Sequence, residues 1–107
     1  MYLKLLNPYP MEKLSTAEIE KELENLDGWE LNENALETTF EFQNFREAFT
    51  LMTRIAFECE QLNHHPDWTN VYNRLHIRLS THDAGGVTQR DFDLAQTIES
   101  LVATDSN

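Results

Sequence analysis

Residues 45–68, FREAFTLMTRIAFECEQLNHHPDW, contain the change of pattern that decides the fold. Up to Leu62 the apolar residues recur at the spacing of an α-helix, which predicts a long amphipathic helix. Pro66 cannot continue that helix, and it biases His65 towards an extended conformation. The helix is therefore expected to end near Leu62, and a strand is expected over residues 68–72.

The helix expected over Phe45–Leu62 carries more apolar surface than packing on one sheet requires. At about 100° per residue, its apolar positions cover an arc of roughly 160°. These positions are Phe45, Ala48, Phe49, Leu51, Met52, Ile55, Ala56, Cys59 and Leu62. Phe57 lies outside the arc, among polar residues. Two interpretations stay open: a larger core with one exposed phenylalanine, or a helix that also contributes to a subunit interface.

Capping signatures indicate where the three expected helices begin. In each, a Ser, Asn or Thr is followed three residues later by an acidic residue that can complete a capping box. The pairs are Ser15 and Glu18, Asn44 and Glu47, and Thr88 and Asp91. The first helix is expected to run to about Leu26, and the tail after the last helix, residues 104–107, is expected to fray.

Alternating apolar and polar residues predict two pairs of strands. The strands are expected at residues 29–31, 36–42, 68–72 and 75–81, with turns near residues 32–34 and 73–74. The order is then helix, two strands, helix, two strands, helix. Paired strands between helices predict an α+β fold, a two-layer, four-stranded antiparallel sheet covered on one side by helices.

The composition indicates one small globular domain over all 107 residues, with residues 1–13 as an irregular N-terminal arm. The net charge of −11 argues against direct contact with nucleic acid and against an anionic membrane surface. The first ten residues are too short and too interrupted by prolines for a signal peptide or a membrane span. The single cysteine, Cys59, cannot form an internal disulfide and is expected to be a small buried hydrophobe. We therefore expect a cytoplasmic location, or a nuclear one by small size or partnership.

Two separate segments place histidines where acid–base chemistry could be done. His64 and His65 follow the long helix, and His82 follows the last strand. Histidine both gives and takes a proton near neutral pH. Consecutive residues of an extended segment point to opposite sides, so His64 and His65 are expected to differ in role. If the helix continues far enough, the carboxylate of Glu60 could reach His64 and fix its tautomer.

Other interpretations of these histidines stay open at this point. A histidine pair at a helix end can interact with free carbonyls and with the negative end of the helix dipole. A metal site formed by His64, His65 and His82 beside Glu60 or Asp83 is a weaker alternative, because the spacing lacks a fixed ligand motif.

Three further residues each have a structural and a functional interpretation. Asp91 can complete the last capping box, yet it falls within the apolar arc of its helix and is expected to point inward. Arg90 could anchor a polar ligand or remain a surface charge. Trp68 fits a core position better than a stacking platform. His76 is expected on the surface of the sheet, without a role in the site.

The chain resembles the pterin-4a-carbinolamine dehydratase family, also known as the dimerisation cofactor of a homeodomain transcription factor. The resemblance rests on four spaced motifs: Glu60-x-x-x-His64-His65-Pro66-x-Trp68, Asn70-Val71-Tyr72-Asn73, His76-Ile77-x-Leu79-Ser80-Thr81-His82 and Arg90-Asp91-x-x-Leu94-Ala95. It extends from Phe42 to Val102, with weaker support before it.

The resemblance implies a lyase that converts 4a-hydroxytetrahydrobiopterin to the quinonoid dihydropterin and water, in the recycling of tetrahydrobiopterin. No metal and no organic cofactor is implied. The implied catalytic residues are His64, His65 and His82, supported by Glu60. The residues implied to line the pterin are Asn63, His64, His65, Ser80, Thr81 and His82. To these we add Trp68, Arg90 and Asp91 as candidate substrate-binding residues. Two departures from the family pattern are Asn63, where aspartate is frequent, and Asp83-Ala84, where animal members have a glutamate–cysteine pair.

The implied reaction agrees with the residue types. Loss of hydroxide from C4a requires a general acid, and removal of the N5 proton requires a general base. We assign this work to His64 and His82, with His65 in binding or proton transfer. The alternative is a non-enzymatic interaction module, a dimerisation or transcriptional cofactor that uses the Phe45–Leu62 helix. A homo-oligomer, dimer or tetramer, is expected through this helix in either case.

Overall fold

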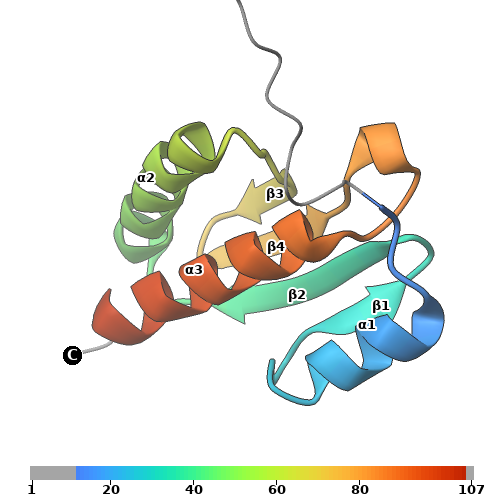
Figure 1. The fold of residues 1–107 in the computed structure, drawn as a ribbon. Helices are drawn as coiled ribbons and strands as arrows, with labels where there is room; N and C mark the ends of the chain where they lie inside the picture. The colour runs from blue at the N-terminus through green and yellow to red at the C-terminus, as the bar shows by residue number, and fades with distance from the viewer. Residues whose placement is uncertain (1–11, 106–107) are drawn as a thin grey trace, which may run out of the picture.

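The computed structural model describes residues 12–105, which form a four-stranded sheet with three α-helices (Figure 1). The elements are α1 (Thr16–Leu23), β1 (Glu30–Asn32), β2 (Ala35–Glu41), α2 (Phe45–Leu62), β3 (Asp67–Val71), β4 (Arg74–Leu79), a one-turn 3₁₀ helix η1 (His82–Ala84) and α3 (Gln89–Asp105). The expected α+β class and the order of helices and strands are confirmed, with η1 as an addition. Within the described residues, no helix is long and apolar enough to cross a membrane.

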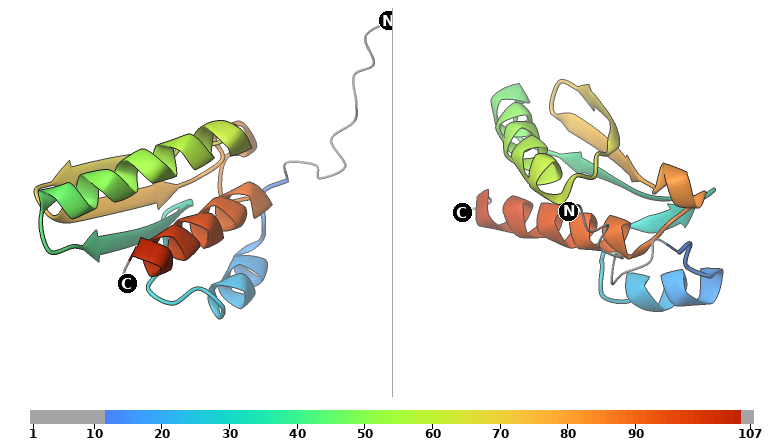
Figure 2. Two further views of the ribbon diagram at one scale, coloured as in Figure 1. Left: turned by 90° about the vertical axis from the view of Figure 1, so that its left-hand side faces the viewer. Right: turned by 45° about the horizontal axis from the view of Figure 1, so that its top comes forward.

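The sheet has the strand order β1-β2-β4-β3, and each strand runs antiparallel to its neighbours. The helices lie on one side of it, so the protein has two layers (Figure 2). On the helix side of β4, the side chains of Leu75, Ile77 and Leu79 are fully buried. His76 and Arg78 alternate with them on the open face, as the period of a strand requires. β4 is thus a central strand, and the segment after its C-terminal end lies near the end of α2 and the start of α3.

The boundaries of several elements differ from the expected ones. Helix α1 ends at Leu23 rather than Leu26, because a turn precedes Gly28, which adopts a left-handed φ of 85°. Helix α3 continues to Asp105, so residues 104 and 105 are helical rather than frayed. Residues 106–107, like residues 1–11 of the expected arm, lie outside the described residues.

The strand ends also differ by one or two residues. The turn after β3 is formed by Tyr72 and Asn73, and Tyr72 takes a φ of 51°. Strand β4 therefore begins at Arg74 and ends at Leu79, while Thr81 makes only an isolated bridge with Gly86. The sequence pattern had extended this strand to residue 81.

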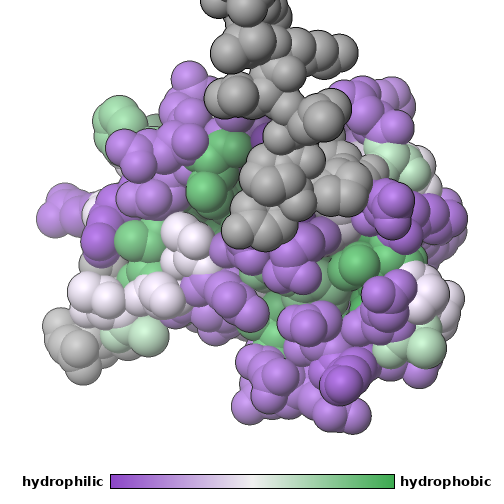
Figure 3. Space-filling model, viewed as in Figure 1, coloured by the Kyte–Doolittle hydropathy of each residue, from purple (hydrophilic) through white to green (hydrophobic). Residues whose placement is uncertain are grey.

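Helix α2 has a buried and an exposed apolar side. Ala48, Leu51, Ile55 and Cys59 are buried. The exposed large hydrophobic residues of this helix are Phe45, Phe49, Phe57 and Leu62, at 45%, 53%, 69% and 40% exposure. The interpretation of α2 as part of a larger core with one exposed phenylalanine is therefore wrong, because three phenylalanines are exposed. In Figure 3 green, apolar patches interrupt the mainly hydrophilic surface, both on the side where α2 lies and in the centre and right of the view.

Candidate active site

A hollow of about 280 Å³ lies between the C-terminal end of α2, the segment that follows β4, and the first turn of α3. We call it the histidine hollow, and it is lined by Asn63, His64, His65, Ser80, Thr81, His82, Asp83 and Arg90. It therefore brings together most of the residues proposed from the sequence. Glu60, Trp68 and Asp91 are not among its lining residues.

The end of α2 sets the direction of the two histidines. Asn63 has a φ of 51°, in the left-handed region. Its amide donates to the carbonyl of Glu60 at 3.3 Å, and the amide of His64 donates to the carbonyl of Cys59 at 3.0 Å. These two bonds form a Schellman motif, which ends the helix and turns the chain aside. Asparagine tolerates this conformation better than most residues, so Asn63 suits the position.

His64 points inward and pairs with a carboxylate from α3. Its Nε2 lies 2.5 Å from Oδ1 of Asp91, and the two residues are 8% and 0% exposed. Because a carboxylate only accepts, Nε2 must be the protonated nitrogen of the neutral ring. Nδ1 is then the nitrogen left for exchange with a ligand. The expected inward direction of Asp91 is confirmed.

Glu60 contacts His65 and not His64, because the helix ends at Leu62 and the condition for the expected contact with His64 is not met. Its Oε2 lies 2.6 Å from Nε2 of His65, and both side chains are largely exposed. The Schellman motif is the physical reason, because His64 leaves the helical path before an i,i+4 contact can form. An exposed pair of this kind contributes little to stability.

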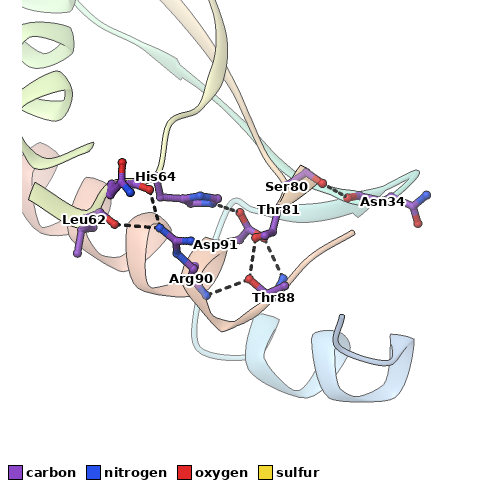
Figure 4. A network of polar contacts seen from close by, with 9 residues as sticks. Asn34, Leu62, His64, Ser80, Thr81, Thr88, Arg90 and Asp91 are labelled. Carbon is purple, nitrogen blue, oxygen red and sulfur yellow. Dashed lines mark hydrogen bonds and ion pairs between the residues drawn. The ribbon is translucent and has the colours of Figure 1, made fainter. Parts of the chain in front are cut away.

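Arg90 closes the end of α2. Its Nη2 donates to the carbonyl oxygens of Leu62 and Asn63 at 3.1 and 2.5 Å (Figure 4). A cation at this position satisfies orphan carbonyls and complements the helix dipole. The neighbouring residue Asp91 meanwhile holds the ring of His64. Two consecutive residues of α3 therefore hold the end of α2: Arg90 binds its last carbonyl oxygens, and Asp91 binds the ring of His64, which follows it.

The segment after β4 supplies one exposed imidazole and one buried hydroxyl. His82 is exposed at the start of η1. The hydroxyl of Ser80 donates to the carbonyl of Asn34 at 2.9 Å, which ties this segment to the β1–β2 turn. Thr81 is only 3% exposed, and its hydroxyl donates to Asp91 at 2.9 Å. Sequence patterns gave no sign of that bond.

Trp68 does not reach the histidine hollow. It pairs with Ile77 in the sheet and packs, partly buried, against the hydrophobic core. The structure thus favours the core interpretation of this residue. Cys59 is 1% exposed, and burial raises the pKa of its thiol to about 11, so it is an inert hydrophobe as expected.

A second hollow, of about 460 Å³, lies beside the first and shares two lining residues with it. His65 and Ser80 line both, and Asn34, Asp67 and Arg78 contribute polar groups to the second. Within residues 12–105, no group of three or more His, Cys, Asp or Glu side chains is arranged to hold a metal ion.

Known proteins share both the sequence and the fold. The sequence profile of the family described as Pterin 4 alpha carbinolamine dehydratase matches residues 12–101. A protein of Christiangramia forsetii, provisionally named a pterin-4-alpha-carbinolamine dehydratase, is 56% identical over 92 residues, covering 86% of this chain and 95% of its own. A Rhizobium leguminosarum bv. trifolii protein with the same provisional name is 52% identical over 95 residues, covering 87% and 94%.

A solved structure supports the same relationship. The crystal structure of a transcriptional coactivator/pterin dehydratase from Brucella melitensis superposes with a TM-score of 0.82 at 36% sequence identity. The match covers 84% of this chain and 98% of the Brucella chain. The matched profile extends from before α1 into α3 and includes every residue that lines the histidine hollow. On this evidence the chain belongs to the pterin-4a-carbinolamine dehydratase family.

Proposed function

We propose that this chain is a lyase that dehydrates 4a-hydroxytetrahydrobiopterin to the quinonoid dihydropterin and water. Membership of the family and the names of its relatives support this activity. The observation that carries it is the pairing of buried His64 with buried Asp91 at the wall of a hollow that His65 and His82 also line.

The reaction needs a proton at the C4a oxygen and a base at N5–H. When C4a–O breaks, the hydroxide leaves as water if an acid protonates it, and the N5–H electrons form the new C=N bond. His64, with its Nε2 proton held by Asp91, offers Nδ1 to a ligand. His82 comes from a different segment, so the two imidazoles can act at different atoms. We assign the acid and base roles to this pair.

Around this pair, the other groups would bind and orient the pterin. His65, oriented by Glu60, stands between the two hollows and is placed for binding or proton transfer. Asn63, Ser80 and Arg90 line the same hollow. The adjoining second hollow leaves room for a substituent on the ring. No metal or organic cofactor enters these steps.

The decisive experiment is turnover of synthetic carbinolamine by the purified protein. His64→Ala and His82→Ala are each expected to lower the enzymatic rate by about 10²- to 10⁴-fold. The matched control is His76→Ala, since His76 lies on the open face of the sheet and bonds to Thr39. Wild-type rates in both site variants, or no turnover by the wild-type chain, would refute the proposal.

The biological setting proposed for this activity is the recycling of tetrahydrobiopterin in the cytoplasm. The pterin is a small polar molecule, and no direct nucleic-acid or membrane partner is proposed for a chain with a net charge of −11.

A second proposal concerns the exposed apolar side of α2. Phe45 and Phe49 stack with ring centroids 5.5 Å apart and remain about half exposed, and Phe57 is 69% exposed. A large apolar patch that is exposed on a protein surface commonly marks a site of association with another protein. We propose that the protein forms a homo-oligomer, a dimer or a tetramer, through α2. If the protein is instead a transcriptional cofactor, its protein partner would bind the same side of α2.

Light scattering at micromolar concentration tests this second proposal. Phe49→Glu is expected to lower the measured mass, because it places a charge in the apolar contact. Gln96→Glu, on the exposed side of α3, adds the same charge and is expected to leave the mass unchanged. A monomeric wild-type protein would contradict the proposal.

A further inference from the structure

A chain of hydrogen bonds links Asp91, the partner of His64, to Thr81 at the edge of the histidine hollow and to Thr88. Asp91 is fully buried, and its Oδ2 accepts from the amide of Thr88 and from the hydroxyl of Thr81, both at 2.9 Å. The hydroxyl oxygens of Thr81 and Thr88 lie 2.7 Å apart, and the Thr88 oxygen accepts from the amide of Arg90 at 3.2 Å. Figure 4 shows these contacts between the start of α3 and the segment after β4.

The direction of the chain follows from the number of protons. A hydroxyl carries one proton, and that of Thr81 is used on Asp91 because a carboxylate cannot donate. The 2.7 Å contact therefore requires Thr88 to donate to Thr81. The order is amide of Arg90, hydroxyl of Thr88, hydroxyl of Thr81, carboxylate of Asp91. Hydrogen bonds connected in this way polarise one another in a buried setting.

The polar groups of Thr81 are occupied within the protein. Its amide donates to the carbonyl of Gly86 at 2.9 Å, and its carbonyl accepts from the amides of Ala84 and Gly85 at 3.0 and 3.1 Å. Its hydroxyl is engaged on both sides, with Asp91 and with Thr88. With 3% of its surface exposed, Thr81 has little left to offer a ligand.

We propose that Thr81 and Thr88 are positioning residues that fix the carboxylate of Asp91, and through it the ring orientation and tautomer of His64. This role differs from the substrate-binding role that the family resemblance implies for Thr81. Without the hydroxyl of Thr81, Oδ2 of Asp91 keeps only the amide of Thr88, and the carboxylate can rotate away from the geometry that holds Nε2–H of His64. The kinetic part of the proposal rests on the proposed dehydratase activity, and the structural part does not.

The kinetic test compares Thr81→Val with Thr81→Ser. Loss of the hydroxyl is expected to lower kcat for the carbinolamine about tenfold and to change KM less than twofold, a loss of the size expected for a hydrogen bond to a charged group. Thr81→Ser keeps the hydroxyl and is expected to restore most of kcat. Thr88→Val, one bond further from Asp91, is expected to have a smaller effect of the same kind. A rise in KM with constant kcat would show a substrate contact and overturn the proposal.

The second readout is ¹⁵N NMR of the resting protein, which needs no turnover. The wild-type His64 ring is expected to show one tautomer with Nε2 protonated, and Thr81→Val is expected to show a mixture. The matched control is Thr39→Val, which removes a threonine hydroxyl bonded to a histidine on the open sheet face. An unchanged His64 signal in folded Thr81→Val would refute the positioning role. Absence of dehydratase activity in the wild type would refute the proposed function, while the NMR result would still decide the proposal.

Discussion

Replacing Asp91 by asparagine is expected to invert the tautomer of His64. Three donors point at the carboxylate: Nε2–H of His64 at Oδ1, and the Thr88 amide and the Thr81 hydroxyl at Oδ2. An amide of the same shape has only one oxygen. The backbone N–H of Thr88 cannot change its role, so the amide oxygen should occupy the Oδ2 position. The NH₂ group then faces Nε2 of His64, which must become an acceptor, and the ring proton moves to Nδ1.

The size of the effect follows from this exchange. With Nδ1 protonated in the neutral ring, the nitrogen directed at a ligand can no longer accept a proton, so kcat should fall by about 10²- to 10⁴-fold. The volume of the side chain is unchanged, and the loss of a charge-assisted hydrogen bond should cost about 1–3 kcal/mol of the free energy of unfolding. For a domain of this size, each kcal/mol lowers Tm by about 4–8 °C. The protein should therefore remain folded at room temperature.

The assay combines the initial rate of carbinolamine loss with ¹⁵N spectra of the His64 ring. Asp91→Ala is a useful comparison, because it removes the carboxylate without offering a donor to Nε2 and should leave a mixture of tautomers. A folded Asp91→Asn protein with wild-type kcat, or one that keeps Nε2 protonated, would refute the assignment of proton positions in the site.

Three further predictions concern residues around the site and in the core. Asn63→Ala should lower the free energy of unfolding by about 1 kcal/mol in thermal or urea unfolding, because φ is 51° there, whereas Asn63→Gly should be nearly neutral; equal losses would contradict the left-handed cap. The thiol of Cys59, with its pKa raised to about 11 by burial, should react with iodoacetamide at pH 8 only after unfolding by denaturant, and rapid labelling of the native protein would disprove its burial. Hydrogen bonds from Asn32 and then Arg78 hold the pKa of Glu37 below its usual value of 4.5, so its stabilisation is present above that pH and is lost as the pH falls through the lowered value. Glu37→Gln should accordingly flatten the acid side of the stability curve, and an unchanged acid limb in urea titrations would argue against this linkage.

Local rules were sufficient for most of the fold. The helical period over Phe45–Leu62 and the alternation around Leu75 are properties of neighbouring residues, and both elements form where the pattern places them. The Ser15 cap also forms as a reciprocal capping box. Errors occurred at ends, where one backbone angle decides the outcome. Tyr72 adopts a φ of 51°, so the turn expected at residues 73–74 lies one residue earlier. The residue type does not reveal this conformation, because a left-handed φ is uncommon for tyrosine.

The site was predicted as a set of residues but not as a set of contacts. The sequence suggested Glu60 as a partner of His64, provided that the helix continued, because residues three or four apart are neighbours on a helix surface. The actual partner, Asp91, is 27 residues away and is brought in by the packing of α3 against α2. Its place in the apolar arc of its helix was a real signal of burial, yet it could not name the buried partner. Thr81 and Thr88 gave no such signal, since a hydroxyl beside a helix start is already explained by capping.

The location of His64 depends on two helices more than on the sheet. Arg90 binds the carbonyl oxygens of Leu62 and Asn63, and Asp91 binds the ring of His64, so a single turn of α3 holds both the backbone just before His64 and the side chain of His64. A shift of α2 relative to α3 would separate Nε2 of His64 from Asp91 while leaving His82, attached to β4, in its place. The distance between the two proposed acid–base groups is thus controlled by the α2–α3 contact. Core substitutions at that contact should therefore lower kcat more than equally destabilising substitutions under α1.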